Sequence, residues 1–304
     1  MSIQASLVKP ILRMVSRTMM RDTDPLALRK GVASTAKRMP PLPDFVTMDI
    51  TNIDGVPAAW FDTPGNDPSR VILYCHGGGY MFCSALTTHR DLLWRLSQAA
   101  ECRVLAIDYR LAPENPFPAA VDDTVTAYRW LLNEGYAPKC LAMAGDSAGG
   151  GLVFGSALRI RDENLPLPAA LVGLSPWTDL AATGASVIKN AKTDALIPGD
   201  GLREGAEYYL QGADPKNPYA SPLYGDMTGM PPTLLQVSNE EVLLDDSRRL
   251  AAKMKAAGVP VLLDVWKGLP HVWQALSMFL PEGRAAIKGI GRFLQGHMKS
   301  RLTR

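Results

Sequence analysis

The sequence predicts an α/β fold with a mostly parallel central sheet and helices on both of its faces. Short, continuous apolar runs alternate with longer helical patterns from residue 71 to the end of the chain, which is typical of parallel strands joined by helical crossovers. In addition, 47% of the 304 residues are apolar. That share is enough to bury one substantial core on both faces of such a sheet.

Each expected element follows from its own pattern. Phe45–Ile50 and Val56–Phe61 flank a turn at residues 52–55, which predicts a hairpin and an antiparallel edge. The later strands are expected at Val71–Cys75, Arg103–Asp108, Cys140–Gly145, Ala170–Ser175, Thr233–Val237 and Val261–Val265. Helices are expected at His89–Ala99, Ala119–Asn133, Ala148–Arg161, Asp246–Ala257 and Glu282–Leu302.

The first 44 residues have a different character. Apolar residues recur there at helical spacing, beginning with Ile3, Leu7 and Ile11, and prolines at 40, 41 and 43 end the pattern. Cations recur at every fourth position, at Lys9, Arg13, Arg17 and Arg21. We expect helices whose apolar side packs on the protein and whose cationic side is solvated. The alternative is a helix that lies on a membrane surface.

Residues 178–225 interrupt the alternation of strands and helices. They contain a loop (Ala181–Pro198), a helix (Asp200–Leu210) and a second loop rich in Pro and Gly. An insertion here lies above the carboxyl ends of the strands, where open α/β sheets bind ligands. The sequence therefore predicts a catalytic domain over residues 45–304, capped by this insertion and by helices within residues 1–44. Candidates for an apolar pocket in the cap are Met14, Met19, Met20, Tyr208, Tyr209 and Leu210.

Composition narrows the functional class. The 32 Lys and Arg nearly balance the 30 Asp and Glu, so a nucleic-acid partner, which requires a basic face, is not expected. The four cysteines form no CxxC pair, and we expect buried thiols rather than a metal site or disulfides. No apolar stretch is long enough to span a membrane, and N-terminal cations interrupt any secretory signal. These features predict a cytoplasmic enzyme without membrane contact.

A nucleophile is indicated by the run Gly145-Asp146-Ser147-Ala148-Gly149. It matches G-x-S-x-G and lies between an expected strand and an expected helix. A serine on such a sharp turn is held with its hydroxyl exposed above the sheet, and the flanking glycines permit close packing of strand and helix. The alternative interpretation is a glycine-rich helix start with serine as a cap. The strand–turn–helix setting favours Ser147 as a nucleophile.

A second motif, His76-Gly77-Gly78-Gly79, ends the strand Val71–Cys75. Successive glycines leave backbone amides free to point at one spot, as an oxyanion requires, and one such donor contributes roughly 3 kcal/mol. A flexible turn is the alternative. Beside a nucleophile elbow, however, this motif can bind the oxyanion through its backbone amides, which favours an oxyanion loop.

The serine needs a base and the base needs an acid. Of the four histidines, His89 and His297 are expected to be surface or packing residues, and His76 belongs to the glycine loop. His271 follows the last strand, where the chain order nucleophile–acid–histidine places the base. The acid should follow Thr233–Val237, where spacing alone leaves four candidates: Glu240 and Glu241 in the loop, and Asp245 and Asp246 at the start of a helix.

These motifs together resemble the hormone-sensitive-lipase-like group of α/β-hydrolases, which includes many bacterial esterases (bacterial family IV). The resemblance covers residues 45–300. It rests on the HGGG run, the GDSAGG run at Gly145–Gly150, and the stretch from Asp108 to Ala120, which matches DYRLAPE-x-x-FPAA. It implies an α/β-hydrolase fold with a helical cap.

The resemblance also implies residue roles. Glu241 takes the position of the family's acid, although the family usually has Asp there, in an Asp-Pro-Leu triplet that is Glu241-Val242-Leu243 here. The implied oxyanion donors are the amides of Gly78, Gly79 and Ala148, with Gly77 as a lesser candidate. Structural support of the active-site loops is implied for Asp108 and Arg110, and we expect the same of the motif residues His76 and Asp146.

The predicted function is hydrolysis of short-to-medium acyl carboxylic esters through Ser147, His271 and Glu241, by chemistry that requires neither metal nor organic cofactor. Amidase, thioesterase and lactonase activities use the same triad and stay open, since leaving-group preference depends on pocket shape. A ligand receptor of the same fold is the alternative outside catalysis. The expected partner is a small ester. A homodimer is also open, because Val261–Val265 is expected at a sheet edge.

Overall fold

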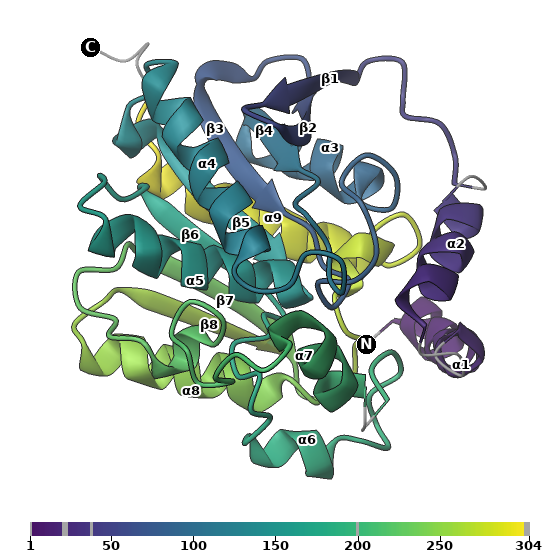
Figure 1. Ribbon diagram of the computed structural model, residues 1–304. Coiled ribbons are helices and arrows are strands. Elements are labelled where there is room, and N and C mark those ends of the chain that lie inside the picture. Colours follow the sequence, from purple (N-terminus) through teal and green to yellow (C-terminus); the bar gives the residue numbers. More distant parts are fainter. Residues whose placement is uncertain (1, 20–23, 37–38, 199–200, 301–304) are drawn as a thin grey trace.

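The structure is a computed structural model, and it describes residues 2–19, 24–36, 39–198 and 201–300. Its centre is one eight-stranded sheet with the order β1-β2-β4-β3-β5-β6-β7-β8 (Figure 1). The strands are β1 (Thr47–Ile53), β2 (Val56–Asp62), β3 (Asp67–Cys75), β4 (Cys102–Ile107), β5 (Leu141–Asp146), β6 (Ala170–Leu174), β7 (Thr233–Ser238) and β8 (Val261–Trp266).

The pairing of the strands confirms the predicted fold class. β1 and β2 pair antiparallel with each other, and β2 pairs antiparallel with β4, whereas all later neighbours are parallel. The carboxyl ends of β3, β5, β6, β7 and β8 therefore meet along one edge, where ligand sites of such sheets are found. β8 lies at the end of the sheet as predicted, and the homodimer that this edge would permit stays a prediction.

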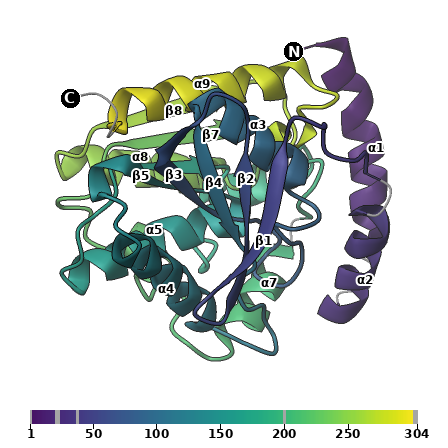
Figure 2. The same cartoon turned by 90° about the horizontal axis from the view of Figure 1, so that it is seen from above.

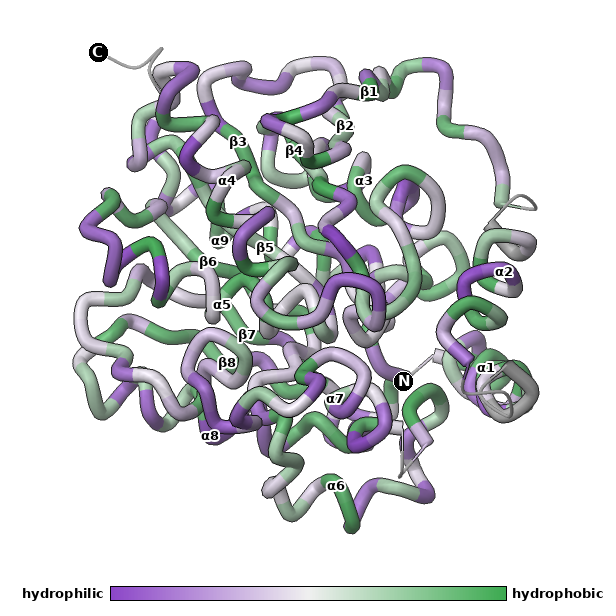
Figure 3. The backbone as a smooth tube through the Cα atoms, in the orientation of Figure 1, coloured by the Kyte–Doolittle hydropathy of each residue, from purple (hydrophilic) through white to green (hydrophobic). Residues whose placement is uncertain are grey.

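Helices cover both faces of the sheet (Figures 1 and 2). The longer helices are α1 (Ile3–Met19), α2 (Pro25–Ala36), α3 (Arg90–Ala100), α4 (Ala119–Asn133), α5 (Ser147–Asp162), α7 (Gly201–Leu210), α8 (Leu244–Ala256) and α9 (Pro281–His297). One core lies between the sheet and α4, α5 and α8, and a second lies between the sheet and α3 and α9. Hydrophobic residues run along interior strands such as β3 and β7, while α8 carries many hydrophilic ones (Figure 3).

Some boundaries differ from the predicted ones. The segment expected to be a loop at Ala181–Pro198 contains the short helix α6 (Ala185–Lys189). The last helix was expected to run from Glu282 to Leu302, but α9 ends at His297 because the next residue, Met298, has an extended backbone. Five residues are too few for a periodic pattern, so α6 leaves no signal in the sequence.

The orientation of α1 is opposite to the predicted one. Its apolar residues Ile3, Leu7 and Ile11 are 79%, 65% and 57% exposed. Lys9 instead forms an ion pair with Glu240, and Arg13 Nη2 donates to the Thr193 carbonyl oxygen at 3.1 Å. The cationic side of α1 thus faces the protein and the apolar side faces away. The side chain of Arg17 and the residue Arg21 lie outside the described residues.

Among the residues that the structure describes, no helix has both the length and the apolar composition required to cross a membrane.

We predict that Gly291→Ala destabilises the protein at the contact between α9 and α3. A Cβ at Gly291 would lie 2.1 Å from the Ala99 carbonyl oxygen, whereas a Cβ at Gly296 of the same helix meets nothing within 4 Å. We expect Gly291→Ala to lower the free energy of unfolding by about 1–3 kcal/mol. Gly296→Ala should leave it unchanged or raise it by up to about 1 kcal/mol. Urea denaturation of both variants measures this, and equal effects would contradict the close approach.

Candidate active site

Ser147 stands at the junction where β5 passes directly into α5. Its backbone is left-handed, with φ 53°, a conformation that costs a non-glycine residue of the order of 1–3 kcal/mol. The turn is possible because β5, α5 and the end of β3 approach closely at Gly149. A Cβ there would lie 2.2 Å from the Cys75 carbonyl oxygen and 2.3 Å from that of His76. This packing holds the serine side chain outward, at the carboxyl edge of the sheet.

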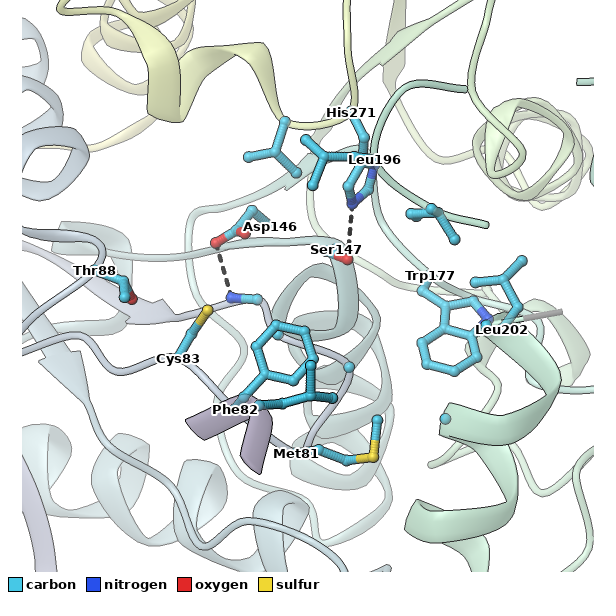
Figure 4. A pocket seen from close by; sticks show the side chains of 18 of the residues that line it. Met81, Phe82, Cys83, Thr88, Asp146, Ser147, Trp177, Leu196, Leu202 and His271 are labelled. Atoms are coloured by element: carbon cyan, nitrogen blue, oxygen red, sulfur yellow. Dashed lines mark hydrogen bonds between the residues drawn. The ribbon is translucent and has the colours of Figure 1, made fainter. Parts of the chain in front are cut away.

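Three side chains from separate loops form one hydrogen-bonded row. His271 Nε2 lies 2.9 Å from Ser147 Oγ (Figure 4), and His271 Nδ1 lies 2.6 Å from Glu241 Oε2. Glu241 follows β7 and His271 follows β8. The other oxygen of Glu241 accepts from the Ser238 amide at 2.6 Å and from Ser175 Oγ at 2.9 Å. The glutamate is therefore held by its own loop and by the loop after β6.

The other three acidic candidates point elsewhere. Glu240 pairs with Lys9 on α1. Asp245 accepts from the Ser186 amide at 2.9 Å, and Asp246 accepts from the Thr178 amide at 2.7 Å. Of the four acids after β7, Glu241 alone contacts His271 in the described structure.

Burial and charge act in opposite directions on His271. Burial is the largest single effect and lowers the pKa of His271, but the carboxylate of Glu241, together with those of Asp194 and Asp146, outweighs it, so the pKa ends above its ordinary value. Glu241 is fully buried and His271 is 6% exposed. A buried carboxylate of this kind stabilises the imidazolium that forms when the histidine takes a proton.

The glycine loop supplies two free amides beside Ser147. In the described chain, the amides of Gly78 and Gly79 donate to no other residue. The Ala148 amide lies in the first turn of α5, where amides lack intrahelical partners. Gly77, the lesser candidate, has a different role, because its amide donates to Asp146 Oδ1 at 3.0 Å. This bond occupies its only donor and ties the loop to the residue before the serine.

Among the predicted supporting residues, His76 and Asp108 contact the glycine loop or the loop that follows it, whereas Arg110 bonds to α4. His76 stacks on Tyr109, with ring centroids 4.4 Å apart, and its Nδ1 lies 2.7 Å from the Gly77 carbonyl oxygen. Asp108 accepts from the Ala85 amide at 2.6 Å, in the loop that follows the glycines. Arg110 faces away from that loop and pairs with Asp123 on α4 at 2.7 Å.

His89, expected to be a surface or packing residue, lies in the active-site region. It is 6% exposed, and its Nε2 lies 3.2 Å from Asp146 Oδ1. Burial is the largest single effect and lowers the pKa of His89, but Asp146, together with the Ser84 backbone and Asp108, outweighs it and raises the pKa above its ordinary value. Tyr74 also donates to this carboxylate at 2.7 Å. A lone histidine near a helix start gives no sequence signal for such a contact, since the partners lie on β3 and β5.

Ser147 and His271 open into a cavity of about 520 Å³. Trp177 and Leu202 lie on one side of the serine, and Cys83 and Thr88 on the other (Figure 4). The apolar residues of its lining include Leu28, Met81, Phe82, Trp177, Leu196, Ile197, Pro198, Leu202, Val272 and Leu276. The lining draws on α2, on α7 and on the segment before α7, all within the predicted cap. The division into cap and catalytic domain stays a prediction.

The predicted pocket candidates contribute little to this lining. Tyr208 lines the cavity. Tyr209 is buried and stacks on Tyr80 at 3.7 Å between centroids, Leu210 belongs to the core, and Met14 is 65% exposed. The side chain of Met19 and the residue Met20 lie outside the described residues.

The chain has relatives of known class. Residues 72–275 match a protein family described as the alpha/beta hydrolase fold. An acetyl-hydrolase of Streptomyces hygroscopicus is 46% identical over 247 residues, which cover 81% of this chain and 82% of that protein. Esterase LipU of Mycobacterium tuberculosis is 39% identical over 239 residues, which cover 76% of this chain and 80% of that protein.

Solved structures match along nearly the whole chain. The crystal structure of an esterase from the bacterial hormone-sensitive lipase family is similar with a TM-score of 0.93 and 45% identity, covering 98% of this chain and 99% of that one. The sheet, the elbow and these matches define an α/β-hydrolase. Within that class, the chain belongs to the bacterial hormone-sensitive-lipase family of esterases, and it is a carboxylic ester hydrolase.

Proposed function

We propose that this esterase cleaves short-to-medium acyl esters through a Ser147–His271–Glu241 triad and an acyl-enzyme intermediate. The observation that carries the proposal is the continuous row of hydrogen bonds, 2.9 Å from Ser147 to His271 and 2.6 Å from His271 to Glu241. Nucleophile, base and orienting acid within such distances are the geometric signature of nucleophilic acyl transfer.

The proposed cycle begins when His271 Nε2 takes the proton of Ser147 as Oγ attacks the ester carbonyl carbon. The resulting oxyanion accepts hydrogen bonds from the amides of Gly78, Gly79 and Ala148. The tetrahedral intermediate collapses, the C–O bond to the alcohol breaks, and His271 returns its proton to the leaving alkoxide. In the second half of the cycle, His271 takes a proton from a water molecule as the water attacks the acyl carbonyl carbon. The bond from that carbon to Ser147 Oγ then breaks and His271 returns the proton to Oγ, which releases the acid and restores Ser147.

The cavity supports a limited acyl length. Trp177 and Leu202, which are 3% and 4% exposed, bound the cavity on one side of Ser147. Apolar lining favours acyl methylenes at about 0.8 kcal/mol for each one buried. This gain in binding free energy ends where the acyl chain reaches the wall that Trp177 and Leu202 form.

Ser147→Ala should abolish hydrolysis of a simple ester such as p-nitrophenyl butyrate, because no other hydroxyl lies in contact with His271 Nε2 in the described structure. The removed hydroxyl leaves the backbone turn in place, so circular dichroism should report an unchanged fold. Turnover clearly faster than the rate expected of a site that lacks a nucleophile would contradict the assignment.

Glu241→Gln should lower kcat by roughly three to four orders of magnitude, as loss of the orienting carboxylate does in comparable triads. Glu240→Gln is the matched control, since it removes the neighbouring carboxylate that pairs with Lys9 rather than with His271. We expect it to retain most activity in steady-state assays. A large loss in Glu240→Gln with little in Glu241→Gln would show that the wrong acid had been chosen.

A series of p-nitrophenyl esters from acetate through butyrate and octanoate to palmitate should show kcat/KM highest at short or medium length. Leu202→Ala should move this maximum toward longer chains, because it removes part of the wall beside Trp177. A maximum at palmitate for the unaltered enzyme would rule out the proposed acyl range.

A further inference from the structure

We propose that Asp194, a residue of the segment before α7, is a positioning residue of the active site. Its carboxylate ties the pocket wall to the loop that carries Glu241, and it adds to the buried negative charge that Glu241 and Asp146 provide near His271. The proposal rests on the triad proposed above, and it assigns to that triad a fourth residue from the cap.

The contacts of Asp194 join two segments with one side chain. Oδ1 accepts from the Leu196 amide at 2.9 Å and from the Ile197 amide at 3.0 Å. Oδ2 accepts from the Val242 amide at 3.0 Å. Leu196 and Ile197 line the active-site cavity, and Val242 directly follows Glu241. The residue is 7% exposed, so water competes little for these three hydrogen bonds.

Neighbouring contacts hold the same two segments together. Asn190 Nδ2 donates to the Glu241 carbonyl oxygen at 2.7 Å and to that of Asn239 at 3.1 Å. Thr193 Oγ1 donates to the Glu240 carbonyl oxygen at 3.1 Å. The loop that presents Glu241 to His271 is therefore bound along its length by the segment that walls the pocket.

Helix α1 contacts both of these segments from the outside of the protein. Ser16 Oγ donates to the Leu196 carbonyl oxygen at 2.5 Å, and Arg13 Nη2 donates to that of Thr193 at 3.1 Å. Lys9 pairs with Glu240. The side of α1 that faces the protein thus lies against both the segment that contains Asp194 and the loop of Glu241.

Charge gives Asp194 a role beyond packing. The carboxylates whose fields reach His271 are those of Glu241 after β7, Asp194 before α7 and Asp146 at the end of β5, and each of them raises the pKa of His271. The nearby cation Lys9 is engaged with Glu240. When His271 takes the proton of Ser147, Asp194 therefore stabilises the imidazolium together with Glu241.

The test compares Asp194→Asn with Asp179→Asn. Asp179 is a buried acid of the same insertion, 1% exposed, but its partners are Thr183, Tyr224 and Arg249 rather than the Glu241 loop. The readout is kcat/KM for p-nitrophenyl butyrate against pH, whose acid limb reports the pKa of the base in the free enzyme. We expect Asp194→Asn to move the acid limb to lower pH by about half a unit to one unit and to lower kcat about tenfold.

Asp179→Asn should leave the acid limb in place, whatever it does to the melting temperature. Asp194→Glu, which keeps the charge but displaces the carboxylate, should keep the wild-type acid limb with a reduced kcat. This second variant carries the test if Asp194→Asn does not fold, and wild-type kcat in Asp194→Glu would then overturn the proposal. An acid limb that stays in place in folded Asp194→Asn, or that moves equally in Asp179→Asn, would also overturn it.

Failure of this proposal is distinguishable from failure of the triad. If Ser147→Ala is inactive while Asp194→Asn keeps the wild-type acid limb and kcat, the triad stands and only the role of Asp194 falls. If Ser147→Ala retains turnover, the triad itself falls.

Discussion

The left-handed backbone of Ser147 is the constraint on which the rest of the site depends. The residue has φ 53°, and nothing local favours that conformation in a serine. It is held because β5, α5 and the end of β3 pack so closely that Gly149 has no room for a Cβ. The strained backbone of Ser147 is thus maintained by the packing of β5, α5 and the end of β3. The place where β3 passes into the glycine loop is part of the same contact, because the carbonyl oxygens of Cys75 and His76 lie against Gly149.

The site is assembled from loops that have little structure of their own. The serine, the glutamate and the histidine follow β5, β7 and β8, and each is tied to another loop by a short hydrogen bond. Asp146 has the corresponding role for the glycine loop, because its carboxylate contacts the Gly77 amide, Tyr74 and His89. Parallel strands bring these loops to one edge, and buried carboxylates then fix their relative positions.

Local patterns were sufficient for the order and type of most elements, because period and turn residues act within a few positions along the chain. They were also sufficient to propose Ser147 and His271 as site residues, because these lie in a motif or in the expected chain order, and the structure brings the two side chains within 2.9 Å of each other. Glu241 needed a family resemblance, since four acids shared its neighbourhood. The direction of α1 could not be predicted, because periodicity shows which residues share a side but not which side packs. The contacts of His89 with Asp146 and of Asp194 with Val242 could not be predicted either, because these partners are distant in sequence.

The contacts of α1 form long after the helix itself is synthesised, because its partners lie far along the chain. Ser2 donates to Glu282 across 280 positions, and Lys9 reaches Glu240 across 231. Chains are made at about 5–20 residues per second, so the helix precedes its partners by roughly 10–60 seconds. Throughout that interval, Lys9 lacks the carboxylate of Glu240, with which it pairs in the structure, and Ile3, Leu7 and Ile11 stay exposed even in the finished fold. In the finished fold, α1 is therefore held by segments near residues 193–196, 240 and 282, all of which are synthesised well after it.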